Sequence, residues 1–224
     1  MSQGLPSRLR ALYRGEVEEV WARIERESPA TYWEENAVLG RLDTFRMLLA
    51  RLEPIADRRI LDAGCGRGLL GRRLAARGAR VTAVDVLADH VSEARERGED
   101  QGPTLAVADF TDLITARGAF DDIILQEVLE DYTAEETLEL LRALARGDTQ
   151  RVHLVFRQPH QWGGLIAPLL PAALVATLDP VTVLRSFHRH TPYRLARKET
   201  VQRRSYSVQV VALTRQEGLA YGDL

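Results

Sequence analysis

The fold of this chain is decided by the stretch Ile60-Leu61-Asp62-Ala63-Gly64-Cys65-Gly66-Arg67-Gly68. Its apolar start predicts a buried strand over residues 59–63. The alternating glycines let the backbone turn sharply and approach a ligand with no Cβ in the way. A helix expected to run from this loop to about Arg77 would point its free amides and positive dipole end at that ligand. Asp62, near the carboxyl end of the strand, is expected to face the ammonium group of an amino-acid ligand.

The chain beyond this loop alternates between strand-like and helix-like segments. Further strands are predicted at 80–84, 105–108, 122–126 and 151–157, and helices at about 88–97 and 133–147. This alternation predicts an α/β fold, with a parallel sheet covered by helices on both faces. Two last strands, at 193–202 and 205–214, predict a terminal antiparallel hairpin, which is unusual for a nucleotide-binding fold.

The segment before the sheet is predicted to be helical. Apolar residues at helical spacing indicate one helix over 7–27 and another from about Val38 to Leu52. We therefore divide the chain into an N-terminal helical cap, residues 1–37, and a ligand-binding domain, residues 38–224.

Composition excludes several classes of protein. The chain has 224 residues, 45% of them hydrophobic, so it can bury a full core, and its net charge of -2 gives no global attraction to nucleic acid. Its only cysteine excludes an internal disulfide and a cysteine-based metal cluster and fits a reducing cytoplasm. The start has no apolar run typical of a signal peptide, and no stretch is long enough to span a membrane. Residues 165–178 are apolar enough to contact a membrane surface or to cover an apolar substrate.

A second acid follows the next predicted strand. Asp85 stands 17 residues after Gly68, where a carboxylate can accept both ribose hydroxyls of a nucleoside. The spacing Gly66-x-Gly68-x-x-Gly71 also satisfies a dinucleotide pattern, so an NAD-dependent reductase is an alternative. Three observations oppose an NAD-dependent reductase. Asp62 stands before the loop, where NAD-binding folds need no acid, and the glycines begin earlier than the dinucleotide pattern requires. The chain is also too short for a separate substrate domain.

The combination of Asp62, the glycine loop, Asp85 and the pair Asp109-Phe110 resembles class I S-adenosylmethionine (SAM) dependent methyltransferases over about residues 38–215. The resemblance implies a Rossmann-like, seven-stranded, mostly parallel sheet with a reversed seventh strand and an N-terminal helical lid. It implies SAM as cofactor, S-adenosylhomocysteine as product, and adenine held by Asp109 and Phe110. The remaining cofactor contacts are expected from the residues of the loop and of the neighbouring strand ends: Gly64, Cys65, Gly66, Gly68, Val86 and Gln126.

A narrower likeness is to magnesium-protoporphyrin IX O-methyltransferases. It rests on Gly40-Arg41, on the block Asp122–Leu129, on Val155-Phe156, and on the closing hairpin. One departure is the pair Asp131-Tyr132, where that family has His-Tyr. The acceptor is therefore expected to be a tetrapyrrole-like compound or another planar or apolar small molecule, such as a natural-product intermediate.

Methyl transfer from SAM is an in-line displacement in which the protein contributes alignment and water exclusion. An acceptor carboxylate needs no base, whereas a hydroxyl benefits from one, and His160 is the candidate base. Tyr32 is expected in a lid over the sulfonium, or in helix-cap packing. Tyr132 is expected to line the acceptor pocket or to be a core aromatic. Arg41 is expected to meet the SAM carboxylate or to be a solvated helix charge.

Two other functions stay open from sequence. One is a non-catalytic SAM-binding module. The other is a nucleic-acid methyltransferase, suggested by the basic segment 181–215; it is disfavoured because no aromatic residues interleave the basic ones. The sequence Gln126-Glu127-Val128-Leu129 after the fourth strand lacks the Asn-Pro-Pro-Tyr type of motif expected for amino-group methylation, which favours oxygen or carbon acceptors.

Overall fold

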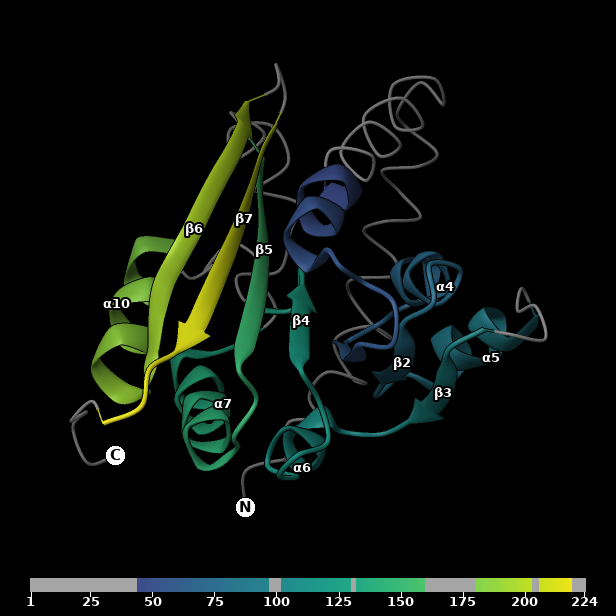
Figure 1. Cartoon of the computed structure of the whole chain (residues 1–224), viewed down its shortest axis with the longest axis horizontal. Coiled ribbons are helices and arrows are strands. Elements are labelled where there is room, and N and C mark those ends of the chain that lie inside the picture. The colour runs from purple at the N-terminus through teal and green to yellow at the C-terminus, as the bar shows by residue number, and fades with distance from the viewer. Residues whose placement is uncertain (1–43, 97–101, 130–131, 160–179, 203–205, 219–224) are drawn as a thin grey trace.

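The computed structural model describes residues 44–96, 102–129, 132–159, 180–202 and 206–218, whose strands form one seven-stranded sheet. Its order is β3-β2-β1-β4-β5-β7-β6 (Figure 1). The strands are β1 (Arg59–Ala63), β2 (Arg80–Asp85), β3 (Thr104–Val107), β4 (Asp122–Gln126), β5 (Arg151–Pro159), β6 (Tyr193–Gln202) and β7 (Tyr206–Arg215). The predicted N-terminal helix over 7–27, the proposed lid and the boundary at residue 37 lie outside the described residues.

Strand directions confirm the predicted fold class. Neighbours among β1 to β5 pair in parallel, whereas β7 runs antiparallel to both β5 and β6. The chain leaves β1 towards β2 and β3 on one side, and leaves β4 towards β5 on the other. In an open α/β sheet such a change of direction opens a crevice at the carboxyl ends of the two central strands.

Six described helices flank the sheet. One covers residues 44–52 and is the end of the helix predicted over 38–52. The others are α4 (Leu69–Ala75), α5 (Ala88–Glu96), α6 (Phe110–Ile114), α7 (Ala134–Arg146) and α10 (Pro180–His190). The sequence analysis did not predict α6 or α10. Among the described residues, no helix is both long and apolar enough to cross a membrane.

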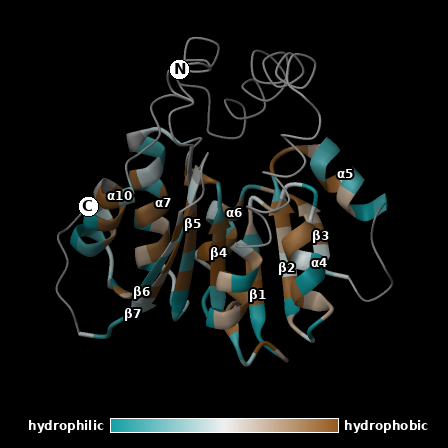
Figure 2. Ribbon diagram, turned by 90° about the horizontal axis from the view of Figure 1, so that it is seen from above, coloured by the Kyte–Doolittle hydropathy of each residue, from teal (hydrophilic) through white to brown (hydrophobic). Residues whose placement is uncertain are grey.

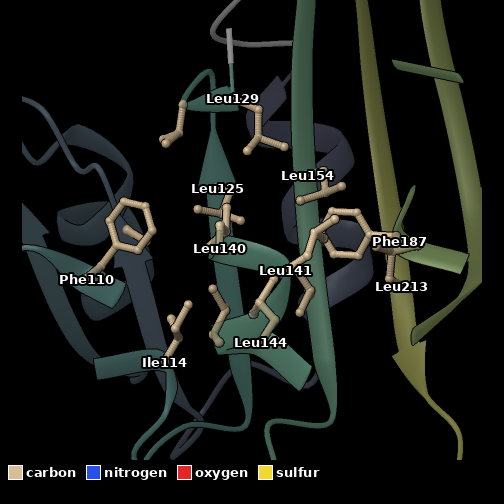
Figure 3. Packing of buried hydrophobic residues seen from close by; sticks show 14 of the residues in the cluster. Phe110, Ile114, Leu125, Leu129, Leu140, Leu141, Leu144, Leu154, Phe187 and Leu213 are labelled. Atoms are coloured by element: carbon tan, nitrogen blue, oxygen red, sulfur yellow. The ribbon is translucent and has the colours of Figure 1, made fainter. Parts of the chain in front are cut away.

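One face of the sheet packs against α6, α7 and α10. Alternate residues of β1, β4 and β5 point to this face, among them Leu61, Leu125 and Leu154. Figure 3 shows these strands meeting Phe110 and Ile114 of α6, leucines of α7, and Phe187 of α10. Burying a side chain of this size stabilises the fold by about 1.5–3 kcal/mol, so this cluster anchors the three helices.

The opposite face carries α4 and the helix over 44–52. Ile60 of β1, Ala83 of β2 and Ile124 of β4 point here and meet Leu48 and Leu74 of the two helices. Figure 2 shows hydrophobic residues concentrated along the central strands, as expected for strands buried on both faces. Because side chains alternate along a strand, Asp62 shares this face with Ile60.

Candidate functional site

The glycine loop follows β1 at the crevice between β1 and β4. Its shape depends on backbone conformations that favour glycine, because Gly64 and Gly66 have φ angles of +75° and +50°. A Cβ on Gly64 would lie 2.6 Å from Cγ2 of Val128, so close packing also requires glycine there. A Cβ on Gly66 would meet no described atom within 4 Å, which leaves open space above the loop.

Asp62 is a buried carboxylate beside this loop. Only 2% of the residue is exposed, and Oδ2 has no hydrogen-bond partner among the residues that the structure describes. Burial raises its pKa to about 7; the backbone amide of Gly71 opposes this rise, and the charge of Asp85 adds to it. A buried carboxylate oxygen without a donor is costly, so Asp62 is suited to receive a cationic ligand group.

Asp85, at the end of β2, is held by two backbone amides. Oδ2 accepts a hydrogen bond from Gly66 N at 2.8 Å, and Oδ1 accepts one from Leu87 N at 2.9 Å. These bonds join the loop after β1 to the turn after β2 and fix the orientation of the carboxylate. An ionised carboxylate has about four acceptor positions, so Asp85 keeps capacity for ligand hydroxyls.

Cys65 and Gln126 also lie at the carboxyl ends of the central strands. Cys65 belongs to the glycine loop, and Gln126 is the last residue of β4. Burial raises the pKa of the Cys65 thiol, which keeps it protonated and supports a packing role, not a nucleophilic one. Gln126 follows Leu125, which is in register with Ala63, so it ends β4 next to the loop. Its Oε1 is buried and finds no hydrogen-bond partner within the described part of the chain.

Asp109 follows β3 and comes directly before α6. Its Oδ1 accepts a hydrogen bond from Thr111 N at 2.9 Å, which makes it the N-cap of this short helix. Capping occupies one carboxylate oxygen and leaves the other for a ligand. Val86, after Asp85, is half-buried and packs against the apolar cluster below the crevice.

Two aromatic residues lie deeper than the sequence analysis expected. Phe110 and Tyr132 are 4% and 5% exposed, and their rings stack at 6.3 Å between centroids. The Phe110 ring packs in the core on α6, and its expected contact with adenine stays a prediction. Tyr132 is placed as a core aromatic, which was one of its two expected roles. Tyr32, Arg41 and His160 lie outside the described residues.

The sequence analysis missed His90. It stands in the first turns of α5, and its Nδ1 lies 3.7 Å from Asp85 Oδ2. A usable signal was available: His90 is the fifth residue after Asp85 and the third of α5, so the first turn of that helix brings it back towards the end of β2. His90 and Gly66 thus both lie next to the Asp85 carboxylate.

Comparisons with known proteins agree with this geometry. Residues 60–147 match the family described as a methyltransferase domain. Magnesium protoporphyrin IX methyltransferase of Arabidopsis thaliana is 33% identical over 112 residues, which cover 49% of this chain and 36% of that protein. Ubiquinone biosynthesis O-methyltransferase of Methylocella silvestris is 40% identical over 79 residues, which cover 34% of this chain and 31% of that protein. The chain thus spans about a third of the length of these relatives.

Solved structures share the fold over a longer range. Magnesium protoporphyrin IX methyltransferase from Synechocystis PCC 6803, solved with bound SAM, superposes with a TM-score of 0.70 at 21% identity. That likeness covers 96% of this chain and 99% of the other. The domain match falls on the segment that builds the crevice, and the fold is shared along nearly the whole chain. Residues 60–147 are therefore similar to a methyltransferase domain, and the chain shares the fold of a methyltransferase that was solved with bound SAM.

Proposed function

We propose that this chain is a SAM-dependent methyltransferase that methylates an oxygen atom of a small-molecule acceptor. One observation carries the proposal: Asp62 and Asp85, at the ends of neighbouring strands, flank a glycine loop with open space above it. This arrangement offers one carboxylate to an ammonium group and another to ribose hydroxyls, at the carboxyl ends of two adjacent strands.

The residues present fit such a cofactor. The unpartnered Oδ2 of Asp62 suits the ammonium group, and Asp85 suits the ribose. Asp109 has an oxygen left for the exocyclic amine of adenine, and Gln126 offers its buried Oε1 to a donor on the ligand. The bound cofactor supplies an activated methyl group, so the chain has only to hold it, align the acceptor and exclude water.

An oxygen acceptor is supported by the sequence after β4 and by the names of the relatives. Gln126-Glu127-Val128-Leu129 lacks the motif expected for amino-group methylation, and one matched relative is named as an O-methyltransferase. A carboxylate or hydroxyl of a tetrapyrrole-like or natural-product compound is the proposed acceptor. For a hydroxyl, His160 remains the proposed base, Tyr32 a proposed part of the lid, and Arg41 a proposed partner of the SAM carboxylate. A cytoplasmic location is also proposed.

Two alternatives make different predictions. An NAD-dependent reductase accounts for the spacing of Gly66, Gly68 and Gly71, but a dinucleotide fold with six parallel strands does not account for the reversed β7. A non-catalytic SAM-binding module would bind S-adenosylhomocysteine and transfer no methyl group. Competition between NADH and S-adenosylhomocysteine distinguishes the reductase from a methyltransferase. Measured turnover of methyl transfer distinguishes the non-catalytic module from an enzyme.

The test of function is methyl transfer from radiolabelled SAM to a panel of porphyrin carboxylates, dihydroxyphenols and amines. We expect label in an oxygen-linked product, and alkali distinguishes a labile methyl ester from a stable ether. Label only in amine products, or no transfer to any acceptor in the panel or in cell extract, would contradict the proposal. Asp85→Ala should abolish the transfer, and Asp121→Asn, which changes a partly exposed carboxylate at the other end of the sheet, should retain it.

A further inference from the structure

The outer side of α10 is a solvent-exposed surface that the function proposed above does not use. Val183 and Phe187 point from this helix into the core, and the side away from them carries a hollow. Val181 is 46% exposed, so an apolar side chain lies open to solvent on that side. Within the described ranges, the hollow is lined by Val181, Leu184, Arg185, His188 and Arg189.

β6 extends this surface. It follows α10 along the chain and lies beside it at the end of the strand order (Figure 1). Leu195 of β6 is paired with Leu213 of β7, and Lys198 is paired with Val211. Leu213 and Val211 belong to the cluster on the α10 side of the sheet, and directly paired residues point to the same face. Leu195, which is 45% exposed, and Lys198 therefore lie on the α10 side as well.

This surface combines apolar side chains with a positive charge. Arg185, Arg189 and Lys198 are exposed on it. α10 contains no acidic residue, and the single acid of β6, Glu199, is paired with arginines and lies on the opposite face of the sheet, opposite Val210. The α10 surface, as we name it, consists of Val181, Leu184, Arg185, His188, Arg189, Leu195 and Lys198.

An anionic lipid surface matches this combination. On a helix that lies in a membrane interface, aliphatic side chains enter the boundary between headgroups and acyl chains, and the long cationic side chains reach lipid phosphates. RNA would leave the exposed Val181 and Leu195 without a partner, and the α10 surface has no aromatic side chain on which a base could stack. The apolar sequence of residues 165–178 ends shortly before α10 begins, so an apolar stretch adjoins this surface along the chain.

We propose that the α10 surface docks the protein on a membrane that contains anionic lipids. The inference goes beyond methyl transfer and requires no bound cofactor. Each of the three cations should contribute roughly fivefold to the affinity for an anionic surface. Because this attraction is electrostatic, salt should weaken it. The exposed aliphatic side chains add a contribution from burial that salt does not screen.

Sedimentation with lipid vesicles measures the docking. The full chain is mixed with vesicles of phosphatidylcholine, or with vesicles of phosphatidylcholine and phosphatidylglycerol in equal amounts. We expect binding to the anionic vesicles alone, and weaker binding at about 0.5 M than at about 0.1 M salt. The triple variant Arg185→Gln/Arg189→Gln/Lys198→Gln should lose roughly a hundredfold in affinity. The double variant Val181→Ser/Leu195→Ser should lose on the order of tenfold.

Matched controls come from the β2–β3 side of the sheet. Arg77→Gln/Arg80→Gln/Arg95→Gln removes three exposed cations, and Val107→Ser removes an apolar side chain that is 43% exposed. Both should bind anionic vesicles like wild type, and thermal unfolding verifies that every variant is folded.

Several results would overturn the proposal. Wild type could bind neither kind of vesicle, or bind both equally, or the triple variant and its charge control could lose the same affinity. Preferential binding of a single-stranded RNA over anionic vesicles, lost in the triple variant, would assign the surface to nucleic acid instead. Vesicle binding is measured without S-adenosylhomocysteine, so its failure would leave the proposed function standing, and failure of cofactor binding would leave the docking surface standing.

Discussion

Asp62 combines a cost in stability with a proposed use in binding. Its pKa is raised to about 7, mainly by burial, whereas an unfolded aspartate titrates near 3.9. Between these values only the folded state keeps the proton, so the contribution of Asp62 to stability falls as pH rises towards 7. Asp62→Asn should therefore stabilise the ligand-free protein, and more so at pH 8 than at pH 5, by a difference on the order of 2 kcal/mol.

Urea unfolding at the two pH values measures this difference, and calorimetry measures the accompanying loss of S-adenosylhomocysteine binding. In wild type near pH 7, binding of the ammonium group should release a proton, seen as a dependence of the binding heat on the buffer. An Asp62→Asn protein that is less stable at pH 8, or that binds as tightly as wild type, would contradict this role.

Gly66 is expected to matter to the ligand and not only to the backbone. Gly66→Ala places a Cβ in the open space above the loop and incurs about 1–2 kcal/mol for a left-handed residue. Gly118→Ala is the matched control, because Gly118 has φ +64° and a similarly free Cβ position, far from the crevice. Thermal unfolding should show similar losses in both variants. Only Gly66→Ala should lose affinity for S-adenosylhomocysteine; equal affinities would contradict the assignment of the crevice.

At the residue scale, the sequence predicted best where topology decides position. Asp62 and Asp85 lie at the same end of the sheet because the carboxyl ends of parallel strands lie side by side. The packing of Phe110 depends on how α6 rotates after Asp109, which nothing in the sequence states, and its expected contact with adenine stays a prediction.

At the element scale, α7 shows how a local motif fixes a helix start. The Thr133 hydroxyl accepts from Glu136 N at 3.2 Å, and Glu136 Oε2 accepts from Thr133 N at 2.8 Å. Thr133→Ala should destabilise the protein by about 1 kcal/mol, whereas Thr133→Ser should retain most of the stability. Chemical denaturation measures both. Because α7 packs on the face opposite Asp62, both variants should bind S-adenosylhomocysteine like wild type; weaker binding would contradict this placement.

Elements with strong local signals were predicted with correct bounds. The apolar runs of β1 and β4 are delimited by charged or polar residues and match the predictions for 59–63 and 122–126. The helix predicted at about 133–147 likewise agrees with α7, whose start is marked by the capping box. The five-residue α6 is too short to display helical periodicity, and α10 follows an apolar, proline-containing stretch that obscures its start.

At the scale of the whole molecule, Asp122 joins the amino ends of the central strands. It is the first residue of β4 and therefore lies at the end of the sheet opposite the crevice. It is fully buried and accepts hydrogen bonds from Arg58 Nε and Arg151 Nε, both at 2.7 Å, and lies 2.8 Å from His153 Nε2. Burial alone would raise the pKa of Asp122, but bonds with His153 and Arg151 outweigh it, and the pKa lies below the ordinary value. These contacts join the segment before β1 to β4 and β5.

Asp122→Asn should cost about 3 kcal/mol, because it removes a fully buried negative charge from two partly buried guanidinium groups, those of Arg58 and Arg151. The partly exposed neighbour Asp121, paired with Arg59, is the matched control, and Asp121→Asn should cost less than about 1 kcal/mol. Since the folded pKa of Asp122 is depressed, the deficit of Asp122→Asn should be complete above about pH 4 and shrink below it. Urea unfolding across pH tests this; equal costs for both variants would contradict the network.

The proposed cofactor site is tested by calorimetric titration of S-adenosylhomocysteine into wild type and Asp85→Ala, with thermal unfolding to verify that both are folded. We predict one-to-one, micromolar-range binding to wild type and its loss in the variant. Absence of binding to folded wild type, or undiminished binding to Asp85→Ala, would show that the crevice between β1 and β4 does not hold an adenosyl amino acid.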